Sequence, residues 1–449
     1  MRCAGAGATP LDAEVEPVTA DRAPSLEEKE AAYEKFVWDN LRRNYLGNYL
    51  HGMLGNTGFR LLNAPTFLPA YLHAISGSSS IVGLGLGLQQ LGGILTPIFG
   101  ANMVEHKTRV MPDAMWMGGM ARLAVLGMGL AGWFLKGQTL VVAILAMMFL
   151  FGVFMGVQRV VFSVLMAKVI PLQRRGRLQA WRNATGGLIA AVVAYAAGRF
   201  FIEPNLFGHG YSVTFILAFV LTSLGISAFS LLLREPEPPT LRPQTRFRER
   251  ITQFPKLVRS DRDYAMFLVV QMLATSSRVA TPFYIIYVGQ TTHLGGAEIG
   301  LLSLAFLGAD TLANLVWGYT GDKAGFRRVL LVSLLLWVAA TVLLMSMHAM
   351  PLVVLAFFGL GAAQSGYMMA SQTMILEFGS REEMAMRIAI STTAESITST
   401  LSPLAGGLMA DHLGFHWVFG VSIGFLVAAL ILLVTSVKEP RRIVRGRRS

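Results

Sequence analysis

The chain has 449 residues, of which 53% are apolar and only 14% are charged, and its mean hydropathy is +0.53. This composition excludes a soluble protein of that length, because apolar stretches long enough to cross a bilayer recur through most of it. Cys3 is the only cysteine, which excludes a disulfide within the chain and argues against a cysteine metal cluster.

Residues 1 to 24 are small, acidic and proline-containing, and they predict a disordered tail. Ser25 and Glu28 then have the spacing of a capping box, and apolar side chains recur near one face from Leu26 to Tyr45. The pattern predicts a helix before the first span. Two placements are open, an amphipathic helix on the inner leaflet or a cytosolic extension of the first span.

Twelve apolar runs follow, each long enough to span a hydrocarbon core about 30 Å thick. Asn56, Arg60 and Asn63 make the first the least apolar of them. The sequence therefore predicts an all-α polytopic membrane protein with twelve transmembrane helices. The runs are 48–72, 80–102, 112–135, 139–163, 179–202, 212–233, 264–288, 298–318, 329–347, 352–375, 386–409 and 415–436.

The basic residues predict the orientation of these spans. If both termini are cytoplasmic, four of the 38 Lys and Arg residues lie in the membrane, only Lys136 and Arg199 lie outside, and the remaining 32 are cytoplasmic. An excess of Lys and Arg in cytoplasmic loops is the usual topology signal. It accounts for the net charge of +12, so nucleic-acid binding is not needed to explain it.

A polar, proline-rich stretch with eight basic residues divides the chain into two halves of six spans. The halves also resemble each other. Pro65 precedes Pro282 by 217 residues, and Gly100 precedes Gly318 by 218, as a duplicated six-helix unit would leave them. The predicted units are a tail and amphipathic helix (1–47), a first bundle (48–233), a cytoplasmic linker (234–263), a second bundle (264–437) and a basic cytoplasmic tail (438–449).

The sequence GYTGDKAGFRR, residues 318–328, lies between the eighth and ninth apolar runs and predicts a tight turn at a membrane face. Its glycines permit close helix approach and unusual backbone angles, its aspartate can cap a helix, and its basic residues favour the cytoplasmic side. The predicted turn residues are Gly318, Asp322, Lys323, Gly325, Arg327 and Arg328.

The pattern Gly-x-x-x-Asp-Lys-x-Gly-x-Arg-Arg resembles the signature loop of the major facilitator superfamily, which follows the second helix of a six-helix half. Here it follows the eighth run, as a second copy would. The first copy, residues 100–109, has Val104 in place of the aspartate. The resemblance covers about residues 44 to 440. It implies two pseudo-symmetric six-helix bundles that rock about a midplane site, with the loop around Asp322 and Arg327 holding the cytoplasmic side in one state.

Ionisable side chains in mid-membrane cost about 2.5–3.5 kcal/mol each, so each needs a reason. The first half has three arginines and no acid, and the second half has one arginine and two acids, which leaves two positive charges without partners. These six residues are Arg60, Arg122, Arg159, Arg278, Asp310 and Glu395.

Arg60 and Arg278 are 218 residues apart, the repeat offset, and each lies near the middle of its span. The resemblance places spans 1, 4, 7 and 10 around one cavity, which adds Arg159 and Gln364 to the candidate substrate-binding residues. A similar arginine pair occurs in the organophosphate exchangers of the superfamily. We expect an anionic group, carboxylate or phosphate, held by bidentate contacts. The alternative is that the arginines bond to backbone carbonyls and to polar neighbours such as Asn56, Asn63 and Gln364.

Asp310 and Glu395 could load and release a proton during transport, because a poorly solvated carboxylate holds its proton more tightly. The alternative is a structural ion pair with Arg278. Arg122 is predicted to be structural, because span 3 is peripheral in the related fold. Five further side chains could line a pocket, although packing is the more common role at their spacing: Gln89, Gln90, Tyr284, Tyr287 and Tyr367.

The sequence shows no Walker loop, HExxH motif or nucleophile elbow, so neither an enzyme, a cofactor nor a metal site is expected. The predicted function is secondary transport of a small, anionic solute by alternating access, with proton coupling, in a bacterial inner membrane. Its expected partners are the substrate and membrane lipid. The alternative is a membrane-embedded binding or assembly factor that has this fold and transports nothing.

Overall fold

The computed structural model describes residues 25–104, 107–238, 261–292, 294–378 and 384–437, and every secondary-structure element in these ranges is helical. Eight of the helices are individually long and apolar enough to cross a membrane. The predicted disordered tail, most of the linker and the basic tail lie outside the described residues.

The first half comprises six spans, two of which are built from two helices each. Span 1 is α2 (Leu41–Asn63) with α3 (Phe67–Ser76), and span 2 is α4 (Ser79–Leu95) with α5 (Pro97–Val104). The others are α6 (Met111–Phe134), α7 (Gly137–Val169), α8 (Leu172–Ala197) continued by the π-turn η1 (Gly198–Ile202), and, after the short η2 (Leu206–Gly208), α9 (Gly210–Leu232).

The second half repeats this plan. Span 7 consists of α12 (Arg262–Ser276), the 3-10 turns η3 (Ser277–Val279) and η4 (Thr281–Phe283), and α13 (Tyr284–Thr291). It is followed by α14 (Gly296–Ala324), α15 (Phe326–Ser346), α16 (Met350–Glu377), α17 (Met384–Leu413) and α18 (Phe415–Ser436). The predicted twelve-span, all-helical fold is thus confirmed.

Spans 1, 2 and 7 are broken, although the apolar runs predicted continuous helices. Pro65 follows the end of α2, and Pro282 lies in the break of span 7. Proline lacks the amide hydrogen that an α-helix needs and disfavours helical angles in the residue before it. Ala64 is accordingly extended, with φ −60° and ψ 141°. The two prolines are the pair related by the repeat offset, so the halves share this break.

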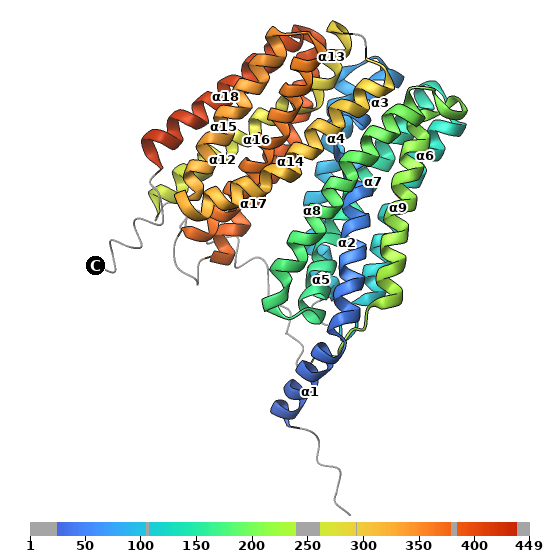
Figure 1. Cartoon of the computed structure of the whole chain (residues 1–449), viewed down its shortest axis with the longest axis vertical. Helices are drawn as coiled ribbons and strands as arrows, with labels where there is room; N and C mark the ends of the chain where they lie inside the picture. Colours follow the sequence, from blue (N-terminus) through green and yellow to red (C-terminus); the bar gives the residue numbers. More distant parts are fainter. Residues whose placement is uncertain (1–24, 105–106, 239–260, 293, 379–383, 438–449) are drawn as a thin grey trace, which may run out of the picture.

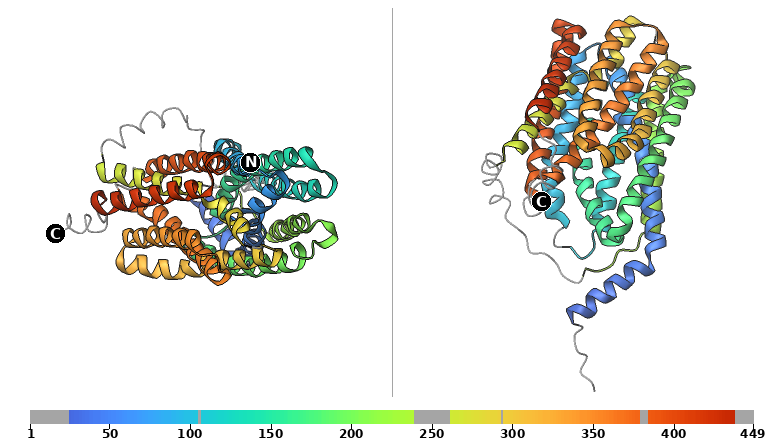
Figure 2. Two further views of the ribbon diagram at one scale, coloured as in Figure 1. Left: turned by 90° about the horizontal axis from the view of Figure 1, so that it is seen from above. Right: turned by 60° about the vertical axis from the view of Figure 1, so that its left-hand side comes forward.

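Each half packs as a separate bundle, and the bundles meet along two pairs of helices (Figures 1 and 2). In the first half α2 packs on α8 and α9, and α7 packs on α4 and α6. In the second half α16 packs between α14 and α15, and α18 packs on α12 and α15. Between the bundles α4 packs on α17 and α8 packs on α14.

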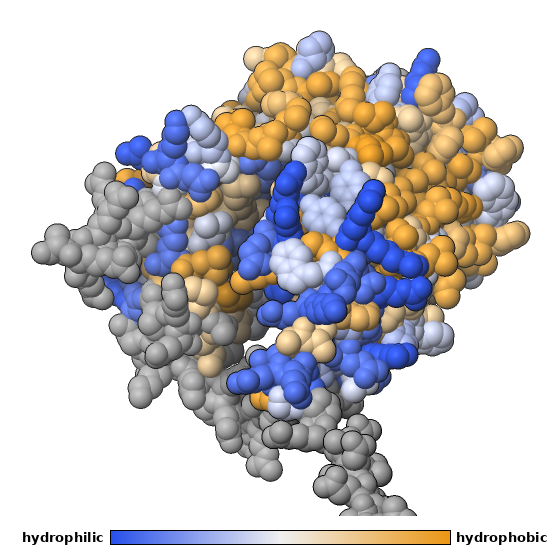
Figure 3. All heavy atoms as spheres, turned by 60° about the horizontal axis from the view of Figure 1, so that its bottom comes forward, coloured by the Kyte–Doolittle hydropathy of each residue, from blue (hydrophilic) through white to orange (hydrophobic). Residues whose placement is uncertain are grey.

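Apolar residues cover the upper and right-hand parts of the molecule in Figure 3, whereas polar residues gather on the face from which α1 projects. Large apolar side chains such as Leu231, Leu315 and Phe134 are exposed on the helices, at 72%, 70% and 76%. A soluble protein would bury these side chains, so this surface suits contact with lipid.

The bundles are joined most closely at the end away from α1. There a methyl group added at Gly83 on α4 would collide with the carbonyl oxygen of Pro403 on α17, and one at Gly407 would lie 2.5 Å from the carbonyl oxygen of Ser79. Figure 1 shows the bundles diverging toward the α1 end. The structure is therefore closed at the far end, with its helices spread at the α1 end.

The predicted helix before the first span is α1 (Leu26–Asp39), and it has the predicted capping box of Ser25 and Glu28. It is joined to α2 through Asn40 and projects beyond the bundle at an angle (Figure 1). The Tyr33 hydroxyl donates to the carbonyl oxygen of Lys168 at 2.9 Å. α1 is therefore tied to the end of α7 and extends the first span, with a bend between them.

Candidate functional site

A cavity of about 540 Å³ lies between the two bundles. Both halves contribute polar side chains to it, and apolar groups such as Phe151, Phe306 and Met368 complete its walls. Its charged and polar side chains are Arg60, Asn63, Gln89, Gln90, Arg159, Arg278, Thr281, Asp310, Gln364 and Ser399.

The breaks in spans 1 and 7 place two of the arginines. Arg60 lies in the last turn of α2, just before Pro65, and Arg278 lies in the 3-10 turn before Pro282. Non-helical backbone at membrane depth is tolerated where it lines a cavity rather than lipid. The proline pair thus accounts for the position of two guanidinium groups at matching sites of the halves.

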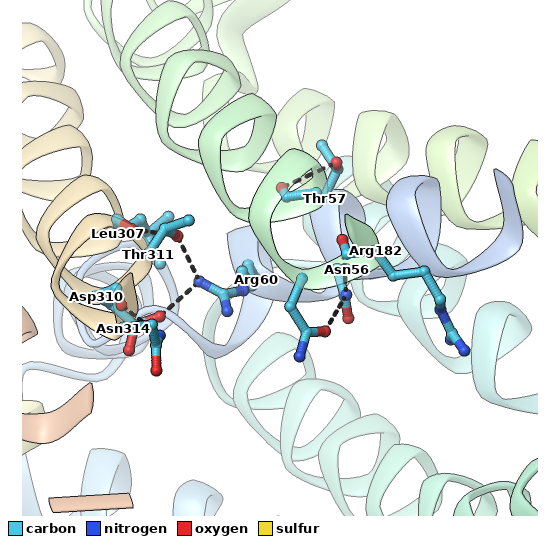
Figure 4. Close-up of polar contacts among 10 residues, drawn as sticks. Asn56, Thr57, Arg60, Arg182, Leu307, Asp310, Thr311 and Asn314 are labelled. Atoms are coloured by element: carbon cyan, nitrogen blue, oxygen red, sulfur yellow. Dashed lines mark hydrogen bonds and ion pairs between the residues drawn. The ribbon is translucent and has the colours of Figure 1, made fainter. Parts of the chain in front are cut away.

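Arg60 and Asp310 form an ion pair across the two bundles (Figure 4). The Arg60 Nη1 donates to Asp310 Oδ2 at 2.6 Å and to Thr311 Oγ1 at 3.2 Å. The two charged side chains are 26% and 22% exposed, so the pair is half-buried. It links α2 directly to α14.

The alternative prediction, an ion pair between Asp310 and Arg278, was therefore wrong. The reason is how closely α14 approaches the first bundle. A methyl group added at Gly187 on α8 would collide with Thr311, so only a residue without a side chain allows this contact. The contact brings the neighbouring Asp310 to Arg60 instead.

Arg159 on α7 and Arg278 come to the same cavity from opposite bundles. Among the described residues neither side chain forms an ion pair. With Arg60 and Asp310, they give the cavity lining three positive charges and one negative charge. The cavity therefore has an excess of two positive charges beside groups that can donate hydrogen bonds.

Amide and hydroxyl groups supply further hydrogen-bonding capacity. Gln89 donates to Asn63 Oδ1 at 2.8 Å, and its own Oε1 is buried and has no hydrogen-bond partner. The hydroxyl of Thr281 is likewise buried and unpartnered. Gln90 and Gln364 also line the cavity. Gln89 and Gln90 therefore line a pocket, although packing between helices was the more common role at their spacing.

Glu395 is separate from this group. The residues described as lining the cavity do not include it, and its carboxylate accepts a hydrogen bond from Gln271 Nε2 at 3.4 Å. Ser391, one turn earlier on α17, donates to the same glutamine. The two predicted proton-coupling acids therefore lie in different environments.

Arg122 is buried and 2% exposed, and its position agrees with the predicted structural role. Its Nε donates to the carbonyl oxygen of Thr222 at 2.7 Å, and its Nη1 donates to that of Gly118 at 2.5 Å. Its third nitrogen lies 3.4 Å from His51 Nε2. This guanidinium ties α6 to α9 and α2 inside the first bundle.

The three tyrosines that could have lined a pocket are packing residues. The Tyr284 hydroxyl lies 2.9 Å from the Thr341 hydroxyl, and that of Tyr367 lies 2.8 Å from the Thr275 hydroxyl. Tyr287 packs edge-on against Phe419. All three are at most 4% exposed.

The signature stretch is mostly helical, whereas a tight turn over residues 318–328 was expected. Helix α14 continues through Gly318, Asp322 and Lys323 to Ala324, and the turn is made by Gly325, whose φ of 91° favours glycine. A methyl group at Gly318 would meet no atom within 4 Å, so close helix approach does not explain that glycine.

The basic residues of this stretch make local contacts. Arg327 Nε donates to the carbonyl oxygen of Val437 at 2.7 Å, and its Nη2 donates to that of Leu433 at 2.9 Å. It thereby satisfies free carbonyls at the end of α18. The Lys323 ammonium lies 4.3 Å from the centre of the Tyr319 ring, and Arg328 lies in the first turn of α15 beside Arg327.

Sequence reasoning did not single out Thr281 and Ser399 as cavity residues. A hydroxyl side chain in an apolar span is common and usually bonds to its own helix, so it gives little signal. Thr281 could have been found from Pro282, because the residues around a broken helix at membrane depth are those that line a cavity.

The chain belongs to the Major Facilitator Superfamily. The family model matches residues 52–277, the first half with the start of span 7, and again 266–448, most of the second half, so that the two matches together cover most of the chain. The predicted resemblance is thereby confirmed.

Similarity to individual proteins is more limited. The multidrug resistance protein MdtG of Salmonella choleraesuis is 27% identical over 163 residues, which are 35% of this chain and 40% of that protein. A crystal structure of a D-xylose-proton symporter matches with a TM-score of 0.69 at 13% identity, over 89% of this chain and 98% of its own. A crystal structure of a mutant of the nucleoside transporter NupG matches with a TM-score of 0.67 at 13% identity, over 88% of this chain and 100% of its own.

Proposed function

We propose that this protein is a secondary transporter that carries a small anionic solute through the cavity between its bundles. The observation that carries the proposal is the pair Arg159 and Arg278, two guanidinium groups from opposite bundles that line one cavity without a carboxylate partner. A guanidinium presents a planar fork of donors that matches a carboxylate or phosphate. An anion held by both would contact both bundles at once.

The charge distribution supports a cytoplasmic location for the α1 end, because most Lys and Arg residues are predicted there. The structure is then inward-facing, with its outer end closed. Relatives named as bacterial multidrug resistance proteins support a bacterial inner membrane. The Arg327 contacts with α18 support the role of the signature stretch, residues 318–328, in holding the cytoplasmic ends of the second bundle.

The anion proposal is tested on purified protein with a panel of anionic metabolites, in which carboxylates and phosphates are compared by thermal stabilisation. A bound ligand raises the apparent stability by mass action. For the stabilising compound, Arg159→Ala and Arg278→Ala should each weaken binding about 10- to 100-fold, because each removes a hydrogen bond to a charged group. The matched control is Arg42→Ala, an exposed arginine of α2 outside the cavity.

Unchanged affinity in both folded variants would contradict the anion proposal. Binding without gradient-dependent flux in proteoliposomes would favour the binding or assembly factor instead.

The ion pair of Arg60 and Asp310 supports proton coupling through Asp310. While both groups are charged they neutralise each other across the bundles. An anion that binds Arg60 would compete with Asp310 for it, and the released carboxylate would gain most from taking up a proton inside the cavity. Each anion would then enter with a proton.

This coupling is tested with the variants Asp310→Asn and Glu395→Gln. Asp310→Asn should abolish the dependence of uptake on a pH gradient while counterflow of the solute continues, because the amide cannot exchange a proton. Glu395→Gln should retain the dependence, since Glu395 is outside the cavity lining. If both variants keep gradient-driven uptake, coupling through these acids is wrong.

A further inference from the structure

Asp411, near the end of α17, caps the first turn of α4 in the other bundle. Its Oδ1 accepts from the Ser79 backbone N–H at 2.9 Å, and its Oδ2 accepts from the Ser80 backbone N–H at 2.8 Å and from the Ser78 hydroxyl at 2.7 Å. The free N–H groups at a helix start carry partial positive charge, so a carboxylate is favoured there. A residue of the second bundle thus completes a helix of the first.

Glu203 makes the reciprocal contact. It follows η1 at the end of span 5, and its Oε2 accepts from the backbone N–H of Ala297 at 3.0 Å, in the first turn of α14. Here a residue of the first bundle completes a helix of the second. In the duplicated fold, spans 5 and 11 correspond, as do spans 2 and 8, so the two contacts are equivalent under the repeat.

Both contacts lie on seams where the backbones of the bundles nearly touch. A methyl group at Gly300 on α14 would lie 2.9 Å from the carbonyl oxygen of Tyr195 on α8, and one at Gly198 would collide with the carbonyl of Gly296. The glycines Gly83 and Gly407 play the same part between α4 and α17. The absence of side chains is what allows each carboxylate to reach the facing helix.

We propose that Asp411 and Glu203 are a pair of latches that hold the outer end of the transporter closed, and that both must release before the cavity opens outward. Each latch joins groups in different bundles, so its hydrogen bonds exist only while the outer end is closed. Rocking the bundles apart leaves a charged carboxylate and several N–H groups to be satisfied by water. The latches therefore favour the inward-facing state and set how readily the empty transporter turns outward.

Glu298 provides a matched control on the same helix. Its carboxylate accepts from the Gly295 backbone N–H at 2.9 Å, at the start of α14, in a contact within one bundle. Opening the outer end does not break this contact. Neutralising Glu298 changes the charge at the same helix start as neutralising Glu203 but leaves the hydrogen bond from Ala297 to Glu203, which joins the bundles, in place.

The test measures the distance between spin labels at the outer ends of the two bundles. Cys3→Ser gives a cysteine-free chain, and Lys136→Cys with Ala349→Cys then places one label on an exposed turn of each half. Pulsed electron–electron double resonance on the full, ligand-free protein measures the distance between the two labels and thereby the closed and open populations. The readout needs no substrate, so the anion proposal can fail without affecting it.

The double variant Glu203→Gln, Asp411→Asn should raise the ratio of open to closed populations about tenfold, and each single variant should raise it less. Glu298→Gln should leave the ratio unchanged. The Glu203→Ala, Asp411→Ala variant removes the acceptors altogether and should shift it further. The proposal is overturned if neither double variant shifts the ratio while elution as a monodisperse peak shows that the protein is folded, or if Glu298→Gln shifts it equally.

Discussion

Four arginines of this protein lie at membrane depth in predicted spans, and their partners decide what each can do. Arg122 gives two of its donors to backbone carbonyls and is 2% exposed, so it has little left for a ligand. Arg60 shares its charge with Asp310, and Arg159 and Arg278 line the cavity without an acid. The same side chain is therefore structural in one place and available for an anion in another.

The structural role of Arg122 predicts the effect of a charge-conserving change. Arg122→Lys keeps the positive charge but cannot reach the carbonyls of Thr222 and Gly118 with a planar fork. One buried carbonyl then loses its donor, which should lower the free energy of unfolding by about 2 kcal/mol. Intrinsic tryptophan fluorescence during heating measures this as a lower melting temperature.

Arg42→Lys is the control. Arg42 is exposed, so the melting temperature of this variant should equal that of the unaltered protein. Binding of the anion per folded molecule should stay unchanged in Arg122→Lys. A melting temperature equal to that of the unaltered protein would show that the two carbonyl contacts contribute nothing to stability.

The charged residues themselves could be predicted from the sequence, whereas their pairing could not. A charge inside an apolar run is conspicuous in a sequence. All four charged residues that line the cavity were found in this way, namely Arg60, Arg159, Arg278 and Asp310. Arg60 and Asp310 are 250 residues apart, and their contact depends on how closely α14 approaches α8. That approach is decided by Gly187, which in the sequence is one small residue among 46 glycines.

At the scale of the helix, glycines and prolines determine where the bundles meet and where the cavity opens. Gly83 and Gly87 on α4 would collide with α17 if they carried side chains, while Gly152 on α7 would collide with α4. These glycines therefore allow the helices to pack closely. Their arrangement between the bundles is new information from the structure.

A large side chain on this seam should drive the outer end open. Gly83→Leu would place its side chain against the Pro403 carbonyl, so the closed state becomes strained while the open state has room. In a Cys3→Ser background with Ser80→Cys, labelling by a membrane-impermeant maleimide added from outside should become several-fold faster. The rate of labelling in intact cells or sided vesicles gives the result.

Gly119→Leu is the matched control, because a methyl group at Gly119 would meet no atom within 4 Å. It adds the same side chain to a transmembrane helix away from the seam. If Gly83→Leu and Gly119→Leu label at the same rate, the α4–α17 seam does not determine closure.

The positions of helices could be predicted better than their continuity. Each of the twelve predicted apolar runs corresponds to a span, although only eight of the described helices are individually long and apolar enough to cross a membrane. Hydropathy does not show the breaks in spans 1 and 7, since Pro65 and Pro282 interrupt the backbone without interrupting the apolar run. The continuation of α14 to Ala324 was also missed, because the helix extends six residues beyond the apolar run that ends at Gly318.

For the molecule as a whole, the closed end away from α1 and the spread α1 end correspond to the inward-facing state of the proposed transport cycle. The contacts between the bundles at the end away from α1 include backbone seams, two carboxylate caps and a hydrogen bond from the Ser303 hydroxyl to Thr66 Oγ1, and these can separate without unfolding either core. The Arg60–Asp310 pair is the link at the cavity. A solute that binds there contacts both bundles, so its charge can alter the balance between the two states.

Locking the outer end should therefore separate binding from transport. The double variant Ser80→Cys, Asp411→Cys in a Cys3→Ser background replaces a latch contact with two thiols, and oxidation should join the bundles at that point. The oxidised protein should bind the stabilising anion with unchanged affinity from the α1 end but show no flux in proteoliposomes, because the cavity cannot turn outward. Reduction should restore flux, and each single cysteine variant should transport under both conditions. Flux that persists in the fully oxidised double variant would show that the outer end need not open for transport.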